Sequence, residues 1–125
     1  MKVFKHVKAN NLMVDGTDST KLHSLLDVQE TDVVLTKCRF GAFSNTALRT
    51  ILTAHEINTL VLSGIATSGV ILTTVAEGFD MDFRVIVLSD VVHDANETVH
   101  GVLLKDVFPR RADVMTSEEW FASKK

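Results

Sequence analysis

Several residue types are scarce in this sequence, and each scarcity excludes a class of protein. The 125 residues include one cysteine, one proline and no tyrosine. A single cysteine cannot form an internal disulfide, so we expect a reducing compartment, the cytoplasm. With one proline and no tract rich in glycine and serine, the sequence has no recognisable linker. It therefore predicts a single domain over residues 1–125.

Excess positive charge and long apolar runs are also absent. The formal net charge is −3 and no cluster of lysine and arginine occurs, which argues against a nucleic-acid partner. The apolar runs are too short to cross a membrane, and the N-terminus lacks the long apolar segment of a signal peptide. No metal site and no cofactor are expected, because the histidines show no ligand spacing; they are His6, His23, His55, His93 and His100.

One strand, turn and helix dominate what the sequence does contain. Leu60–Ser63 is a short apolar strand that ends at Gly64, and an apolar-faced helix follows over Thr67–Phe79. Thr67 or Ser68 is expected to cap that helix. Unpaired helix N–H groups and the positive end of the helix dipole then point into the crevice above the strand. The sequence therefore predicts a ligand site at this place.

The remaining pattern predicts a three-layer α/β/α domain with a mostly parallel, Rossmann-like sheet, because strands alternate with single helices. Asp94 and Glu97 have the spacing of a capping box at the start of one helix, which Pro109 should end. The other expected elements are strands at Val3–Val7, Val33–Thr36, Arg84–Leu88 and Ala112–Met115, helical turns at Leu22–Leu26 and from Ser117 to Trp120, and a helix over Asn45–Glu56 capped by Ser44.

Several motifs resemble those of the isochorismatase-like cysteine hydrolases. Lys37–Phe43 matches that family's K-x-x-x-[SG]-A-F segment, and Gly64–Thr67 and Arg84–Asp90 resemble the rest of its signature. Asp15–Thr17 with Leu22 and His23 is similar to the G-T-x-x-x-x-L-H segment that precedes the lysine strand. The resemblance covers about residues 3–116 and implies the family's fold and its hydrolysis of amide or vinyl-ether bonds.

Family members use an Asp/Lys/Cys triad, and the resemblance implies where each member would fall. The triad lysine falls on Lys37, and a non-proline cis peptide falls between Ile65 and Ala66. The backbone N–H groups that hold the oxyanion fall on Ala66 and Val70. The nucleophile position also falls on Val70, which has no thiol. Possible ligand contacts fall on the neighbouring residues Thr67, Ser68 and Gly69.

The triad aspartate has no match, since the chain as given begins at about the family's second strand. A sheet that lacks an inner strand has unpaired edges, so we expect a homo-oligomer in which a partner covers them. Alternatively, the natural chain is longer and carries the aspartate strand.

Two functions from different classes remain open. In the first, the domain has lost the triad chemistry and binds a small molecule or a protein. In the second, it hydrolyses small amides or esters with Ser68 or Thr67 as nucleophile and Lys37 as cationic helper. Lys37 is either an anion anchor in the crevice or a lysine that pairs with a carboxylate or faces solvent. Cys38 is expected to be an ordinary, semi-buried thiol, and Asp90 a residue that fixes a loop.

Overall fold

The computed structural model describes residues 2–124, which divide into two compact units between Val34 and Leu35. The units are described separately below. The single domain over residues 1–125 stays a prediction.

The first unit contains little regular structure. Helix α1 spans Lys2–Ala9, and the 3-10 turn η1 spans Asp18–Thr20. The strand predicted at Val3–Val7 is therefore wrong. Val3 and Val7 are four residues apart, which places them on one helix face, and His6 and Lys8 lie in the last turn, where positive charge stabilises a helix. Leu22–Leu26 forms only a turn, closed by a 2.9 Å hydrogen bond from the Leu26 amide to the His23 carbonyl.

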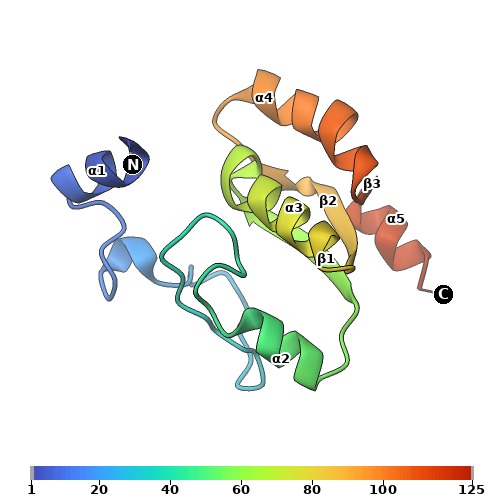
Figure 1. The fold of residues 1–125 in the computed structure, drawn as a ribbon, viewed down its shortest axis with the longest axis horizontal. Helices are drawn as coiled ribbons and strands as arrows, with labels where there is room; N and C mark the ends of the chain where they lie inside the picture. The colour runs from blue at the N-terminus through green and yellow to red at the C-terminus, as the bar shows by residue number, and fades with distance from the viewer. Residues whose placement is uncertain (1, 125) are drawn as a thin grey trace. The chain divides into compact units, whose positions relative to one another are not determined.

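The second unit is built on a three-stranded parallel sheet in the order β1-β2-β3 (Figure 1). The strands are β1 (Thr59–Ile65), β2 (Arg84–His93) and β3 (Asp113–Met115). Parallel neighbours need crossover connections, and helices supply both of them. The predicted α/β class and its parallel sheet are confirmed. So are the strands predicted at Leu60–Ser63, Arg84–Leu88 and Ala112–Met115, although β2 continues five residues beyond Leu88.

The first crossover is the π-type turn η2 (Thr67–Ile71) followed by α3 (Leu72–Asp80). The second consists of α4 (Glu97–Val102), the π-type turn η3 (Leu103–Val107) and the 3-10 turn η4 (Phe108–Arg110), which contains Pro109. The core lies between these crossovers and β2, because Val85–Leu88 are at most 8% exposed. Its cluster consists of Ile71, Val75, Val85, Val87, Val92, Leu103 and Phe108.

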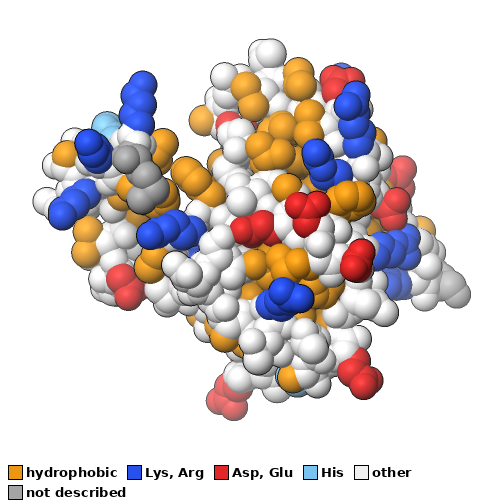
Figure 2. Space-filling view, viewed as in Figure 1, with side chains coloured by type: hydrophobic (Ala, Val, Ile, Leu, Met, Phe, Trp, Pro, Cys, Tyr) orange, Lys and Arg blue, Asp and Glu red, His pale blue; other side chains and the backbone are white. Residues whose placement is uncertain are grey.

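The outer surface of these crossovers carries charges of both signs. Acidic and basic side chains lie among apolar ones over α3 and α4 (Figure 2). Within residues 2–124, no helix has the length and apolarity needed to cross a bilayer.

Two predicted elements upstream of β1 differ from the structure. Residues 33–36 form no strand, and the Val33 and Val34 side chains are 60% exposed, because an apolar run becomes a strand only where a neighbour pairs with it. Helix α2 spans Leu48–Ala54 instead of starting at Asn45, whose φ of +57° is not helical. Ser44 is not its cap, because its hydroxyl donates to Glu77 Oε1 at 2.7 Å.

The helices that follow β2 and β3 are capped by other residues than those predicted. Asn96 caps α4 by accepting a 3.1 Å hydrogen bond from the Val99 amide, while Asp94 faces another part of the chain. Thr116 caps α5 (Ser117–Ala122) in a capping box with Glu119. Ser117 instead donates its amide and hydroxyl to Asp90 at 2.8 and 2.5 Å. These two bonds lower the pKa of Asp90, as expected for a residue that fixes a loop.

The segment that carries Lys37 is attached to α3 at two points. The Ala42 amide donates to Thr74 Oγ1 at 3.1 Å, and Ser44 donates to Glu77. Gly41 lies directly against the Glu77 carboxylate, and a Cβ at this position would overlap it. Glu77 Oε2 is buried without a hydrogen-bond partner, and a methyl group at position 41 would have to displace this carboxylate.

We predict that Gly41→Ala lowers the free energy of unfolding by about 1–3 kcal/mol, the usual cost of overpacking. Chemical denaturation of the wild type and the variant measures this difference. Gly101→Ala is the matched control, because nothing lies within 4 Å of its Cβ position in α4, and it should stabilise by roughly 0.5–1 kcal/mol. In a Glu77→Ala background, Gly41→Ala should cost much less. An equal cost in both backgrounds would contradict the overlap with Glu77.

Candidate functional site

The carboxyl ends of β1 and β2 form the candidate site. The two strands pair regularly up to Leu62 and Val87, and after a register shift Ile65 pairs with His93. Gly64 lies at this shift with φ of +107°, a conformation that glycine adopts most readily. The irregularity places the end of β1 beside His93 and exposes Ile65, whose side chain is 73% accessible.

The chain then turns into the first crossover. The peptide bond between Ile65 and Ala66 is cis, at the position that the family resemblance predicts. The Ala66 carbonyl accepts hydrogen bonds from the amides of Gly69 and Ile71, at 3.1 and 3.3 Å. Residues 64–71 are therefore folded back tightly over the carboxyl end of β1.

Thr67 and Ser68 do not cap this helix, contrary to prediction. Ala66 is its N-cap residue, and no side chain forms the cap. Thr67 is completely buried, and its hydroxyl is 2.9 Å from His100 Nδ1. Ser68 is exposed, but its hydroxyl donates to Asp94 Oδ2 at 2.6 Å and its amide to the same oxygen at 2.7 Å.

Asp94 connects the two crossovers. Besides the two Ser68 donors, it accepts the Asn96 amide on Oδ1 at 3.0 Å, and only 7% of the residue is exposed. The Ser68 hydroxyl, followed by the amides of Asn96 and Ser68, lowers the pKa of Asp94 to about 2. A weaker contribution comes from the charge on His100. The carboxylate is therefore ionised and multiply hydrogen-bonded.

His93 and His100 complete the polar group around this turn. Their ring centroids are 6.3 Å apart, and the rings are tilted by 49°. His93 is exposed at the end of β2, whereas His100 is partly covered in α4. In residues 2–124 no three His, Cys, Asp or Glu side chains lie close enough to hold a metal ion.

Val70 lies in the first turn of the crossover, on its inner side. The side chain is half-buried and packs against the core cluster. On the outer side, the Phe40 ring approaches to 3.6 Å of the position that a Cβ at Gly69 would take. Position 70 thus supplies packing, and position 69 lies beneath an aromatic ring.

Lys37 and Cys38 lie on the exposed segment before α2. The Lys37 ammonium donates to the carbonyls of Arg39 and Phe40, at 2.7 and 3.3 Å. Lys37 is exposed, and no carboxylate is among these partners, so its role as an anion anchor stays a prediction. Cys38 is a free thiol and is exposed, not semi-buried as predicted, because its neighbours in the segment are exposed as well.

Sequence reasoning had identified Thr67, Ser68 and Asp94 but not their partners. Asp94 was interpreted as a cap because it follows a strand and precedes Glu97. Neither His100 nor the pairing of Asp94 with Ser68 has a local signal, since the bonded residues are 33 and 26 positions apart.

We predict that Asp94→Asn destabilises the protein at pH 7, because the ionised carboxylate accepts three hydrogen bonds. The pKa of Asp94 lies below its ordinary 3.8 in the folded protein, so this stabilisation is present above about pH 4 and is lost as the pH falls towards about 2. Urea unfolding at several pH values between 2 and 7 checks this.

The difference between wild type and Asp94→Asn should therefore shrink over that interval. Asp106→Asn removes another carboxylate from the second crossover and serves as control, since it should leave the low-pH profile unchanged. An Asp94→Asn effect of constant size from pH 7 to pH 2 would contradict the assigned role of the ionised carboxylate.

Comparison with known proteins agrees with the resemblance found in the motifs. The Isochorismatase domain family matches residues 2–119. The isochorismatase family protein YwoC of Bacillus subtilis is 34% identical over 95 residues, 76% of this chain and 50% of YwoC. The maleamate amidohydrolase of Pseudomonas putida is 32% identical over 107 residues, 86% of this chain and 50% of that enzyme. The chain thus spans about half the length of these relatives.

Solved structures give the same result. An isochorismatase-like hydrolase from Alkaliphilus metalliredigens superposes with a TM-score of 0.86 at 27% identity. The match covers 91% of this chain and 63% of that one. By sequence and by structure, the chain belongs to the isochorismatase family of hydrolases.

Proposed function

We propose that this chain binds a small organic molecule at the carboxyl ends of β1 and β2 without hydrolysing it. The observation that carries the proposal is that no candidate nucleophile on the turn is both accessible and paired with an effective base. Thr67 is completely buried beside His100, so a substrate has no access to its hydroxyl, and the Ser68 hydroxyl donates a hydrogen bond to Asp94. Val70, to which the family resemblance assigns the nucleophile position, offers only methyl groups.

The partner of Ser68 is unsuited to activate it. A general base works best with a pKa near the working pH. The pKa of Asp94 is about 2, so this carboxylate accepts a hydrogen bond from the Ser68 hydroxyl but has little affinity for its proton. Lys37, the cationic helper of the alternative hydrolase, donates to backbone carbonyls of its own segment.

The same place offers surface suited to binding. Ile65 at the end of β1 is 73% exposed, and Val91 near the end of β2 is 45% exposed. Ser68 and His93, which carry polar groups, are exposed close to these positions in the chain. Ligand sites commonly combine an apolar surface with a few fixed polar groups, at the carboxyl ends of parallel strands. The substrates for which two relatives are named are the first ligands to try. Relatives include a maleamate amidohydrolase and a ureidoacrylate amidohydrolase.

The test is to incubate the full chain with maleamate and with ureidoacrylate while following ammonia release and amide chemical shifts in parallel. We expect saturable shifts at residues 63–70 and 93–100 and no ammonia above the protein-free blank. Shifts should weaken in Ile65→Ser, which removes the exposed apolar contact, and persist in the matched surface variant Ile57→Ser.

Ammonia release that disappears in Ser68→Ala or Thr67→Val, but not in Ser123→Ala, would overturn the proposal in favour of the altered hydrolase. Release that depends on Cys38 in a Cys38→Ser variant would overturn it in favour of an unrecognised thiol mechanism. Absence of any saturable shift would remove the binding part of the proposal.

We also propose that the chain forms a homo-oligomer through β1. Within residues 2–124, β1 pairs with β2 on one edge and with no strand on the other. Thr59–Ile65 contains no charged residue and no proline, the two features that commonly protect an exposed edge. Antiparallel pairing with a second copy of β1 would therefore oppose no like charges.

Sedimentation equilibrium should accordingly give a dimer, and Val61→Pro, which removes one N–H donor and fixes φ, should shift it to monomer. Val114→Pro in β3 tests whether a strand proline alone has this effect. A monomeric wild type, or equal dissociation by both variants, would contradict pairing through β1.

A further inference from the structure

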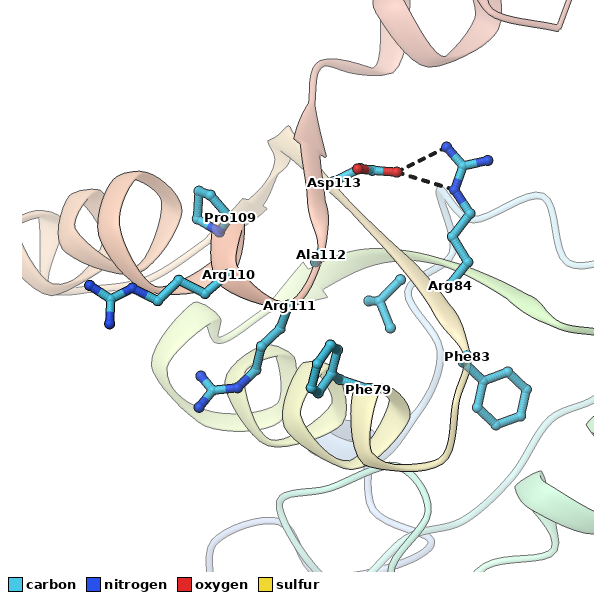
Figure 3. A pocket seen from close by; sticks show the side chains of 9 residues that line it. Phe79, Phe83, Arg84, Pro109, Arg110, Arg111, Ala112 and Asp113 are labelled. Atoms are coloured by element: carbon cyan, nitrogen blue, oxygen red, sulfur yellow. Dashed lines mark hydrogen bonds and ion pairs between the residues drawn. The ribbon is translucent and has the colours of Figure 1, made fainter.

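A hollow lies at the amino ends of β2 and β3, at the end of the sheet opposite the candidate site (Figure 3). Its volume is about 300 Å³, which is at the lower limit of small-molecule pockets. Five apolar residues and four charged ones line it; they are Phe79, Phe83, Val85, Pro109 and Ala112, and Arg84, Arg110, Arg111 and Asp113.

The apolar part of this hollow includes an uncovered aromatic ring. Phe79 is in the last turn of α3 and is 47% exposed. In Figure 3 its ring lies between the Arg111 side chain and the strand that begins at Arg84. An exposed ring of this kind offers a face on which another planar group can stack.

The charged part is unevenly balanced. Arg84 donates to Asp113 Oδ2 through Nε at 3.1 Å and Nη2 at 2.9 Å, so these two charges neutralise each other. Arg110 and Arg111 are exposed, and neither forms an ion pair within residues 2–124. The hollow therefore has an excess of positive charge in a chain whose formal net charge is −3.

Arg111 is the better placed of the two arginines. Figure 3 shows its side chain running beside Phe79, whereas the Arg110 side chain extends away from the hollow. A guanidinium group presents paired N–H donors that match the two oxygens of a carboxylate. A planar ring seated on Phe79 would bring an attached carboxylate within reach of these donors.

We propose that this hollow binds a small aromatic carboxylate. The ring lies against Phe79 and the apolar floor at Val85 and Ala112, and Arg111 binds the carboxylate. Arg110 adds to the local positive potential without direct contact. The proposal does not depend on the proposed function, because the two sites lie at opposite ends of the sheet.

The test uses benzoate as probe and benzyl alcohol as its neutral counterpart, with amide chemical shifts of the full chain as readout. We expect saturable benzoate shifts at residues 79–85 and 109–113, with a dissociation constant of about 1 mM. Benzyl alcohol should bind roughly fivefold more weakly, because it lacks the charge. Raising the salt concentration should weaken benzoate binding and leave benzyl alcohol unchanged.

Arg111→Gln should weaken benzoate binding about fivefold and leave the rest of the spectrum in place. Arg49→Gln, which removes the same charge from α2 outside the hollow, is the matched control and should change nothing. Equal weakening by both variants would overturn the proposal in favour of a general charge effect. Benzoate shifts confined to residues 63–70 and 93–100, or no saturable shifts, would overturn it as well.

Discussion

The Asp94 carboxylate holds together the part of the structure in which a function is sought. It accepts two hydrogen bonds from Ser68 at the start of one crossover and one from the Asn96 amide at the start of the other. Because the acceptor is ionised and only 7% of the residue is exposed, these bonds are charge-assisted and protected from solvent. The two turns at the carboxyl end of the sheet are therefore fixed relative to each other.

The hydrogen bonds that fix the two turns also determine whether the neighbouring hydroxyls can act as nucleophiles. A serine at the start of a helix above a parallel sheet is a plausible nucleophile by position alone. Here the Ser68 hydroxyl instead donates a hydrogen bond to Asp94, and the buried Thr67 hydroxyl is hydrogen-bonded to His100. Both side chains stabilise the turn. Thr67 is completely buried, and the acceptor of the Ser68 hydrogen bond is a carboxylate with a pKa of about 2, so neither pair combines an accessible hydroxyl with an effective base.

Sequence reasoning succeeded where the signal was local and the segment was buried. The strands around Leu60 and Val85 and the helix from Thr67 were predicted because apolar runs and helical spacing coincide there with real burial. It failed at Val33–Thr36, where an equally apolar run has no paired strand and stays exposed. The periodicity of apolar residues indicates which side chains a segment could bury. Pairing with a neighbouring strand decides whether those side chains are buried.

The candidate site divides in the same way. The family motif predicted the cis peptide at Ile65–Ala66, because that prediction needed only the order of residues. The caps were wrong because several acceptors competed for the same donors. Asp94 and Asn96 both had the chemistry to cap α4, and the tertiary bond to Ser68 took Asp94 out of that competition. A capping preference inferred from four consecutive residues takes no account of a hydrogen-bond partner 26 positions away.

The two proposed sites lie at the two ends of β2, which is close-packed between them. β2 starts at Arg84 beside the arginine-rimmed hollow and ends at His93 beside the candidate site, a length of about 30 Å. Between them, Val85–Leu88 are at most 8% exposed and packed from several sides. Coupling between distant sites requires an element with two alternative arrangements. The close packing of Val85–Leu88 and their pairing with β1 and β3 give this strand a single arrangement in the structure.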